Sequence, residues 1–337
     1  MSSTAVAVSR PRRALHALLA PRRKLAIKIA LSVTLVVWLV HSTDRDALTT
    51  ALLEVDLLNA LLAVVLLFML IAIQTWRWVI VAQAIGVSFP FVPAWLINQI
   101  GAFFNQVLPS SIGGDAIRVW RLRSGGVRTG PAVASIVIDR LVALVGTILI
   151  VVVGLWWILG WIDIIALRVG VFATVLTAVV GVTVLLFADQ VSSVRRLARR
   201  SGLARVLRLP VMARLVLFRP RTAAPALALS VTIHLGVALS VWVLADGIGV
   251  ELTSAEAAFL VPVVILFSMV PITIAGWGVR EGAMVVALGT VGVGREEALA
   301  VSVLFGIASA IAALPGGAIW LATGRSRETG ASTAATT

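Results

Sequence analysis

Three short groups of charged residues lie inside otherwise apolar sequence. They are Asp115 with Arg118, the adjacent pair Asp139 and Arg140, and the adjacent pair Arg280 and Glu281. A charged side chain at the centre of a bilayer costs on the order of 3 kcal/mol, so such residues indicate either a functional site or a structural salt bridge. An arginine can bind a phosphate through two parallel hydrogen bonds, and a carboxylate beside it can balance the charge or carry a proton. The chemistry that these groups suggest is therefore anion binding.

Two of the groups end a short stretch that is rich in Pro and Gly. The first stretch reads PSSIGGDAIR, from Pro109 to Arg118, and the second reads PITIAGWGVR, from Pro271 to Arg280. Pro and Gly interrupt helices and free backbone groups, and a helix N-terminus exposed at such a break attracts anions. The residues that we expect to make the breaks are Pro109, Gly113, Gly114, Pro271, Gly276 and Gly278.

The candidate substrate-binding residues follow from these groups and breaks. They are Asn105, Asp115, Arg118, Asp139, Arg140, Arg280 and Glu281. Structural alternatives stay open for each of them: Asn105 could satisfy freed backbone groups, and Asp115 could cap a helix and pair locally. Arg140 could reach the membrane interface, whereas Asp139 has a shorter reach and needs a partner. Arg280 and Glu281 could pair with each other or across to the first break.

The composition places these groups in a membrane protein. The chain has 337 residues, of which 60% are hydrophobic and 13% charged, and its mean hydropathy is +1.06. Several apolar runs approach or exceed the roughly 18 residues that indicate a transmembrane helix. The formal net charge of +13 lies mainly in loops beside apolar runs, which is typical of cytoplasmic loops that contact anionic lipids. We therefore predict an all-α polytopic membrane protein with no nucleic-acid partner.

Six apolar segments are long enough to cross the membrane, at roughly 25–41, 57–82, 132–158, 164–187, 223–245 and 297–323. Basic residues lie before the first segment and in 189–222, and acidic residues lie in the loops 42–56 and 246–256. This distribution predicts a plasma-membrane protein with both termini in the cytoplasm. The remaining segments 94–123 and 257–293 each contain one of the breaks. Each must begin and end on one side of the membrane, so we predict two re-entrant helical hairpins.

Other features of the sequence add detail to this predicted topology. At the end of the second segment, we expect Trp76 and Trp78 in an interfacial belt and Arg77 as a residue that extends to the interface. The adjacent Gly316 and Gly317, near the end of the last segment, predict a close helix contact. The predicted division is a basic cytoplasmic N-terminus at 1–24, one membrane domain at 25–323 with an Arg-rich cytoplasmic loop at 189–222, and a disordered cytoplasmic tail at 324–337.

The two breaks are similar to each other. Pro, Ile, Gly and Arg occur at the same offsets in PSSIGGDAIR and PITIAGWGVR. Three full spans separate the two hairpins, so the hairpins approach the midplane from opposite sides, which is typical of inverted repeats. Chance similarity in a chain of few residue types is the alternative.

No residues indicate a metal, a cofactor or ATP hydrolysis by this chain. The chain has no Cys, and its three His lie far apart in sequence. It also has no GxxxxGK[ST] motif, so it has no P-loop. We therefore expect no cofactor and no metal site.

The motifs N-x₂-LP-x-S-x-GGD-x₂-R, the intramembrane Asp139–Arg140 pair and P-x-T-x-AG-x-G-x-RE together resemble one known family. This is the lysylphosphatidylglycerol synthase transmembrane-region family, also called flippase-like, which includes the N-terminal membrane half of the multiple peptide resistance factor. The resemblance covers about 25–323 and implies a lipid-flipping membrane domain. Some members carry a soluble aminoacyl-phospholipid synthase domain. The residues after 323 leave no room for one, so we do not expect that activity.

The function that we predict is a lipid translocase for a polar or anionic headgroup. Two alternatives stay open: an intramembrane enzyme on lipid-linked substrates with Asp115 or Asp139 as base, and a membrane scaffold for a separate synthase or glycosyltransferase. The expected partners are membrane lipids that are anionic or carry phosphate, with a separately encoded lipid-modifying enzyme as a further partner.

Overall fold

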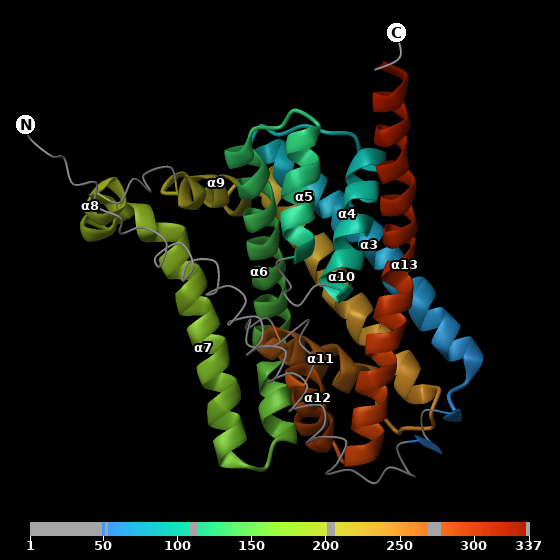
Figure 1. The fold of residues 1–337 in the computed structure, drawn as a ribbon. Helices are drawn as coiled ribbons and strands as arrows, with labels where there is room; N and C mark the ends of the chain where they lie inside the picture. The colour runs from blue at the N-terminus through green and yellow to red at the C-terminus, as the bar shows by residue number, and fades with distance from the viewer. Residues whose placement is uncertain (1–48, 51–52, 108–112, 201–205, 269–277, 335–337) are drawn as a thin grey trace, which may run out of the picture.

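The computed structural model describes residues 49–50, 53–107, 113–200, 206–268 and 278–334. These residues form eleven α-helices and one short 3₁₀ helix, arranged as a bundle (Figure 1). The prediction of an all-α membrane protein is confirmed.

Five helices are long and apolar enough to cross a membrane. They are α3 (Leu57–Ala84), α6 (Thr129–Trp161), α7 (Ile165–Phe187), α10 (Pro220–Asp246) and α13 (Arg295–Ala334). Even the shortest, with 23 residues, is about 35 Å long at 1.5 Å per residue, which exceeds the roughly 30 Å hydrocarbon core. These helices agree with five of the six predicted spans. The sixth, 25–41, lies outside the described residues.

Two pairs of shorter helices flank the predicted breaks. The first pair is α4 (Phe91–Val107) and α5 (Gly113–Ser124), and the second is α11 (Ser254–Ser268) and α12 (Val279–Gly289). Within each pair the two helices pack against each other. The segments that connect them, 108–112 and 269–277, lie outside the described residues, and so do the predicted break residues Pro109, Pro271 and Gly276.

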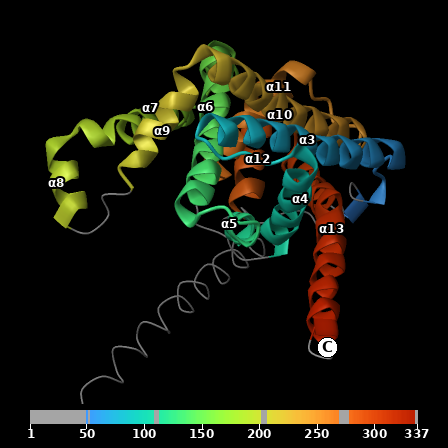
Figure 2. The same cartoon turned by 90° about the horizontal axis from the view of Figure 1, so that it is seen from above.

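The predicted Arg-rich loop contains helices of its own. After the 3₁₀ helix η1 (Ala188–Gln190) come α8 (Ser192–Arg200) and α9 (Arg208–Leu217). Both views show α8 at the side of the molecule that lies away from α13 (Figures 1 and 2). Arg214 of α9 donates hydrogen bonds to both carboxylate oxygens of Asp189, at 2.6 and 2.7 Å. This hydrogen bonding raises the pKa of Arg214 and connects α9 to η1.

The helices pack around α10, which contacts α3, α6 and α11. Apolar side chains of α6, α7, α10, α11, α12 and α13 contribute to the largest core cluster, which includes Val151, Val241, Leu260 and Leu288. Helix α13 also packs closely on α4. A Cβ atom on Gly316 would come within 2.0 Å of the Gln99 carbonyl oxygen, so the predicted close helix contact is confirmed.

Helix α13 extends beyond the part that can cross the membrane. The apolar part ends at Thr323, and the helix continues to Ala334, into the stretch predicted as a cytoplasmic tail. The domain boundaries proposed at 24 and 323 stay predictions.

Candidate functional site

The start of α5 and the middle of α6 bring four candidate residues together. On α5, the Arg118 Nη1 lies 3.2 Å from the Asp115 Oδ1. On α6, the Arg140 Nε lies 3.0 Å from the Asp115 Oδ2, and the Asp139 Oδ2 lies 3.7 Å from the Arg118 Nη2. Residues about 25 apart in sequence therefore form one ionic network, in which Asp115 is shared by two arginines.

A fifth member, Arg77 of α3, completes this network. Its Nε donates to the Asp139 Oδ1 at 2.9 Å, and the two side chains are only 2% and 0% exposed. The prediction that Arg77 extends to the membrane interface is therefore wrong, because its site is enclosed by other helices and Asp139 supplies the counter-charge. The sequence shows only its aromatic neighbours, and these are typical of an interface. We call Arg77, Asp115, Arg118, Asp139 and Arg140 the charge network.

The two tryptophans beside Arg77 differ from each other in burial. Trp76 is 59% exposed, as an interfacial residue would be, but Trp78 is fully buried. The Trp78 indole donates to the Ser135 hydroxyl at 3.3 Å, and the Arg118 guanidinium carbon lies 4.1 Å from the centroid of the Trp78 ring. Trp78 is therefore part of the site and not of an interfacial belt, and it provides a cation–π contact for Arg118.

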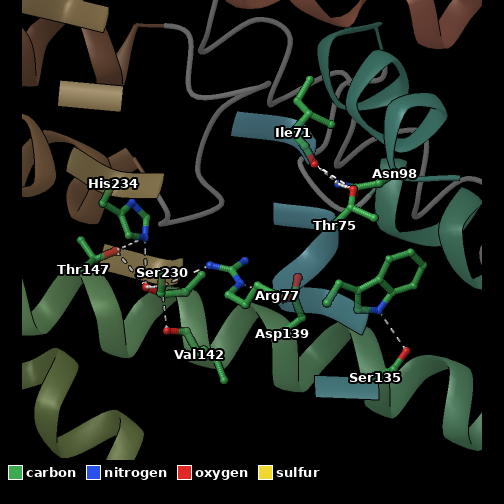
Figure 3. A network of polar contacts seen from close by, with 12 residues as sticks. Ile71, Thr75, Arg77, Asn98, Ser135, Asp139, Val142, Thr147, Ser230 and His234 are labelled. Atoms are coloured by element: carbon green, nitrogen blue, oxygen red, sulfur yellow. Dashed lines mark hydrogen bonds and ion pairs between the residues drawn. The ribbon is translucent and has the colours of Figure 1, made fainter. Parts of the chain in front are cut away.

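Polar contacts continue from the charge network into α10 (Figure 3). The Arg77 Nη1 donates to the Ser230 hydroxyl at 3.1 Å. Ser230 in turn donates to the Val142 carbonyl at 3.2 Å. One turn further along α10, the His234 Nε2 lies 2.8 Å from the Thr147 hydroxyl. Sequence reasoning missed Ser230 and His234, because isolated polar residues in an apolar helix show nothing of their partners.

Arg118 has hydrogen-bonding capacity that the described residues do not use. Its side chain is 2% exposed, and both its Nε and its Nη2 are buried without an acceptor. The 3.7 Å separation from Asp139 is an ion-pair distance but too long for a hydrogen bond. Because a buried donor without a partner is unfavourable, this geometry suits a further acceptor such as a phosphate oxygen. With three arginines and two aspartates, the charge network also has one more positive than negative charge.

The start of α5 is held tightly against α4. The Asn105 Oδ1 accepts the Gly114 backbone N–H at 3.0 Å, so Asn105 satisfies a freed backbone group, one of its two predicted roles. A Cβ atom on Gly114 would come within 2.0 Å of the Gly101 carbonyl oxygen. The predicted break residues Gly113 and Gly114 thus form the first turn of α5, where the absence of side chains lets α4 approach.

The second group of charges forms a separate cluster at the start of α12. Arg280 pairs with Glu281, the first of the two arrangements considered above. The Glu281 carboxylate also accepts the N–H of Gly278, which has a φ of 87°, a conformation that favours glycine. The Arg280 guanidinium carbon lies 5.5 Å from the centroid of the Phe305 ring on α13. This cluster is built by α12 and α13, whereas α3, α5 and α6 build the charge network.

Helices of membrane-spanning length around a charge network in which Arg77, Arg118 and Asp139 are buried define a multi-pass membrane protein with a polar centre. The family model described as lysylphosphatidylglycerol synthase TM region matches residues 25–317. The chain therefore belongs to this family, as the sequence motifs predicted. A search of curated proteins gave no significant match.

Proposed function

We propose that this protein is a lipid translocase that binds a polar, anionic lipid headgroup at the charge network while the acyl chains stay in the bilayer. The observation that supports this most strongly is Arg118, a buried arginine with unused donors in a cluster of net positive charge. A phosphate ester is the headgroup group that matches those donors in charge and geometry. The start of α5 adds the partial positive charge of a helix N-terminus.

The second proposal concerns how the headgroup reaches the middle of the membrane. We propose that the pairs α4–α5 and α11–α12 are re-entrant hairpins related by an inverted repeat. The close packing within each pair and the Pro- and Gly-rich connections support this arrangement. Arg280 would bind the headgroup at the second break. Asp115, Asp139 and Glu281 would balance its charge or couple its movement to protons.

The orientation and partners complete the proposal. The protein would lie in the plasma membrane with both termini in the cytoplasm, where Arg195, Arg196 and Arg200 of α8 would contact anionic lipids. A separately encoded lipid-modifying enzyme could supply the transported lipid. Because the chain has no Cys, single cysteines in the α6–α7 connection and at the end of α5 test the orientation by labelling in intact cells. Only the first should react with an impermeant reagent, and the opposite pattern would reverse the proposed topology.

Transport in liposomes tests the central proposal. Purified protein is reconstituted with a panel of fluorescent lipids that differ in headgroup, and transbilayer movement is followed by chemical quenching. We expect the protein to speed up the transbilayer movement of at least one anionic lipid. The variant Arg118→Ala with Arg280→Ala should not speed up this movement. Arg123→Ala, a change at an exposed arginine of α5, should leave the rate unchanged.

The same experiment distinguishes the two rival functions. No change in movement for any lipid, or normal activity of the double variant, would contradict the translocase. A chemically altered lipid, detected by mass spectrometry, would support an intramembrane enzyme. Co-purification of a synthase or glycosyltransferase, together with tolerance of the double variant, would support a scaffold.

A further inference from the structure

A cavity of about 290 Å³ lies among α6, α7, α11 and α12 and is not part of the charge network. Its walls include Ile162, Val171, Leu260, Val264 and Val286. Thr290 is the one polar side chain among the described residues that line it, and its hydroxyl donates to the Ala287 carbonyl at 2.6 Å. These described residues therefore offer no side-chain donor or acceptor that lacks a partner.

This lining excludes water and favours hydrocarbon. A buried water needs two to four polar partners, and an apolar cavity without them stays dry or binds an apolar molecule. The cavity is also continuous with the outer surface of the bundle, because Val286 lines it and is 50% exposed. On the same side, α7 has only three buried residues, Val171, Val175 and Leu186. At membrane depth, what surrounds such a surface is the acyl chains of lipids.

Two glycines enlarge the cavity from different walls. Gly170 of α7 and Gly282 of α12 both line it, and a Cβ atom on either would meet nothing within 4 Å. The space in front of these glycines is therefore open, whereas Gly114 and Gly316 are in tight backbone contact. A larger side chain at either position would fill the cavity without displacing a helix.

The cavity runs along α12 between Gly282 and Thr290, which are roughly 12 Å apart at 1.5 Å per residue. Thr290 lies at the end of α12, and the lining also includes Ile162, at the end of α6, and Leu167, near the start of α7. Figure 1 shows the α6–α7 connection and α12 toward the same end of the molecule. One end of the cavity is therefore near the membrane surface at the α6–α7 connection, and the other is near the second charge cluster.

We infer that this cavity binds one acyl chain of a phospholipid from the leaflet at the α6–α7 connection. The chain enters beside Thr290 and Ile162, and its methyl end lies near Gly282. The site contacts the hydrocarbon of the lipid and does not select among headgroups, so binding there is independent of headgroup binding at Arg118.

Photolabelling from the acyl chain tests this site. The full-length protein is reconstituted with phospholipids that carry a diazirine either near the ester or near the terminal methyl, then irradiated, digested and mapped by mass spectrometry. We expect adducts on Leu260 and Val264, which are only 2% exposed, so bulk lipid cannot label them. The methyl-end probe should favour residues near Gly282, and the ester-end probe residues near Thr290.

Matched glycine variants provide the control. Gly170→Leu with Gly282→Leu should reduce the adducts on Leu260 and Val264 to background, while adducts on the exposed Val184 persist. Gly181→Leu, at an exposed glycine of α7 that also meets nothing within 4 Å, should change neither.

Three outcomes would overturn the inference. The first is an absence of adducts on the α11 residues of the unmodified protein, and the second is ester-end labelling near Gly282 with methyl-end labelling near Thr290. The third is a cross-link from a photoreactive residue at 171 to the segment 25–41. The last would show that the predicted first span occupies the cavity. All three outcomes leave the proposal for Arg118 unaffected.

Discussion

At the scale of single residues, the buried ion pair between Arg77 and Asp139 is the feature that most needs both of its partners. Both side chains are almost fully shielded, and removing one partner of such a pair leaves a charge without compensation in a poorly polarisable interior. Ser230 and Trp78 depend on the same arrangement, since Ser230 accepts from Arg77 and Trp78 packs under Arg118. We conclude that Arg77 positions Asp139, and Asp139 in turn faces Arg118.

A double-mutant cycle tests this role of Arg77. Arg77→Met should lower the free energy of unfolding in detergent by about 3–5 kcal/mol, because buried Asp139 loses its hydrogen-bonded partner and keeps only the longer ion pair with Arg118. Adding Asp139→Asn should recover part of that loss, since it removes the buried carboxylate that has lost its hydrogen-bonded partner. Arg123→Met, at an exposed arginine, is the control. Equal effects of Arg77→Met and Arg123→Met would mean that the pair contributes nothing.

At the scale of helices, the contact between α4 and α5 sets the position of the charge network. Gly101 and Gly114 face each other across it: a Cβ on Gly101 would lie 2.9 Å from the Arg118 Cγ, and one on Gly114 would lie 2.0 Å from a backbone oxygen. Because Asp115 and Arg118 follow Gly114 directly, any separation of these helices displaces both charges.

Gly114→Val should therefore destabilise the protein and disturb the network. The clash is with backbone, which cannot move aside as a side chain can, so we expect at least the roughly 1–3 kcal/mol typical of overpacking. Gly160→Val in α6 is the matched control, because that glycine is exposed and a Cβ there would meet nothing within 4 Å. Thermal unfolding in detergent measures both, and equal melting temperatures would contradict the proposed contact.

The sequence predicts helices of this protein far better than contacts between them. Long apolar runs have one stable form in a bilayer, so the spans could be located from composition alone. In the α4–α5 and α11–α12 pairs, the first helix ends and the second begins on either side of the segment where Pro and Gly predict a break. The burial of Arg77 could not be predicted, because it depends on α6 and α10 packing beside α3. Asp139 did indicate that a partner was needed, but its spacing did not show which arginine.

At the scale of the whole molecule, the two charge clusters and the apolar cavity described above are built by different sets of helices, which overlap at α6 and α12. The charge network belongs to α3, α5 and α6, and the Arg280–Glu281 cluster to α12 and α13. The cavity lies beside the second cluster, among α6, α7, α11 and α12. This distribution separates sites suited to a headgroup from a site suited to an acyl chain, as the proposed translocation of whole lipids requires.

Native mass spectrometry of lipid binding is the sharpest test of the proposal that Arg118 binds an anionic headgroup. Purified protein is mixed with equal amounts of an anionic and a zwitterionic phospholipid, and the bound lipids are counted for the unmodified protein, Arg118→Gln and Arg123→Gln. Loss of hydrogen bonds to a charged group costs about 1.5–3 kcal/mol. We therefore expect Arg118→Gln to bind one anionic lipid about tenfold or more weakly than the unmodified protein, whereas Arg123→Gln retains it. Equal retention of anionic lipid by both variants would show that Arg118 does not bind the headgroup.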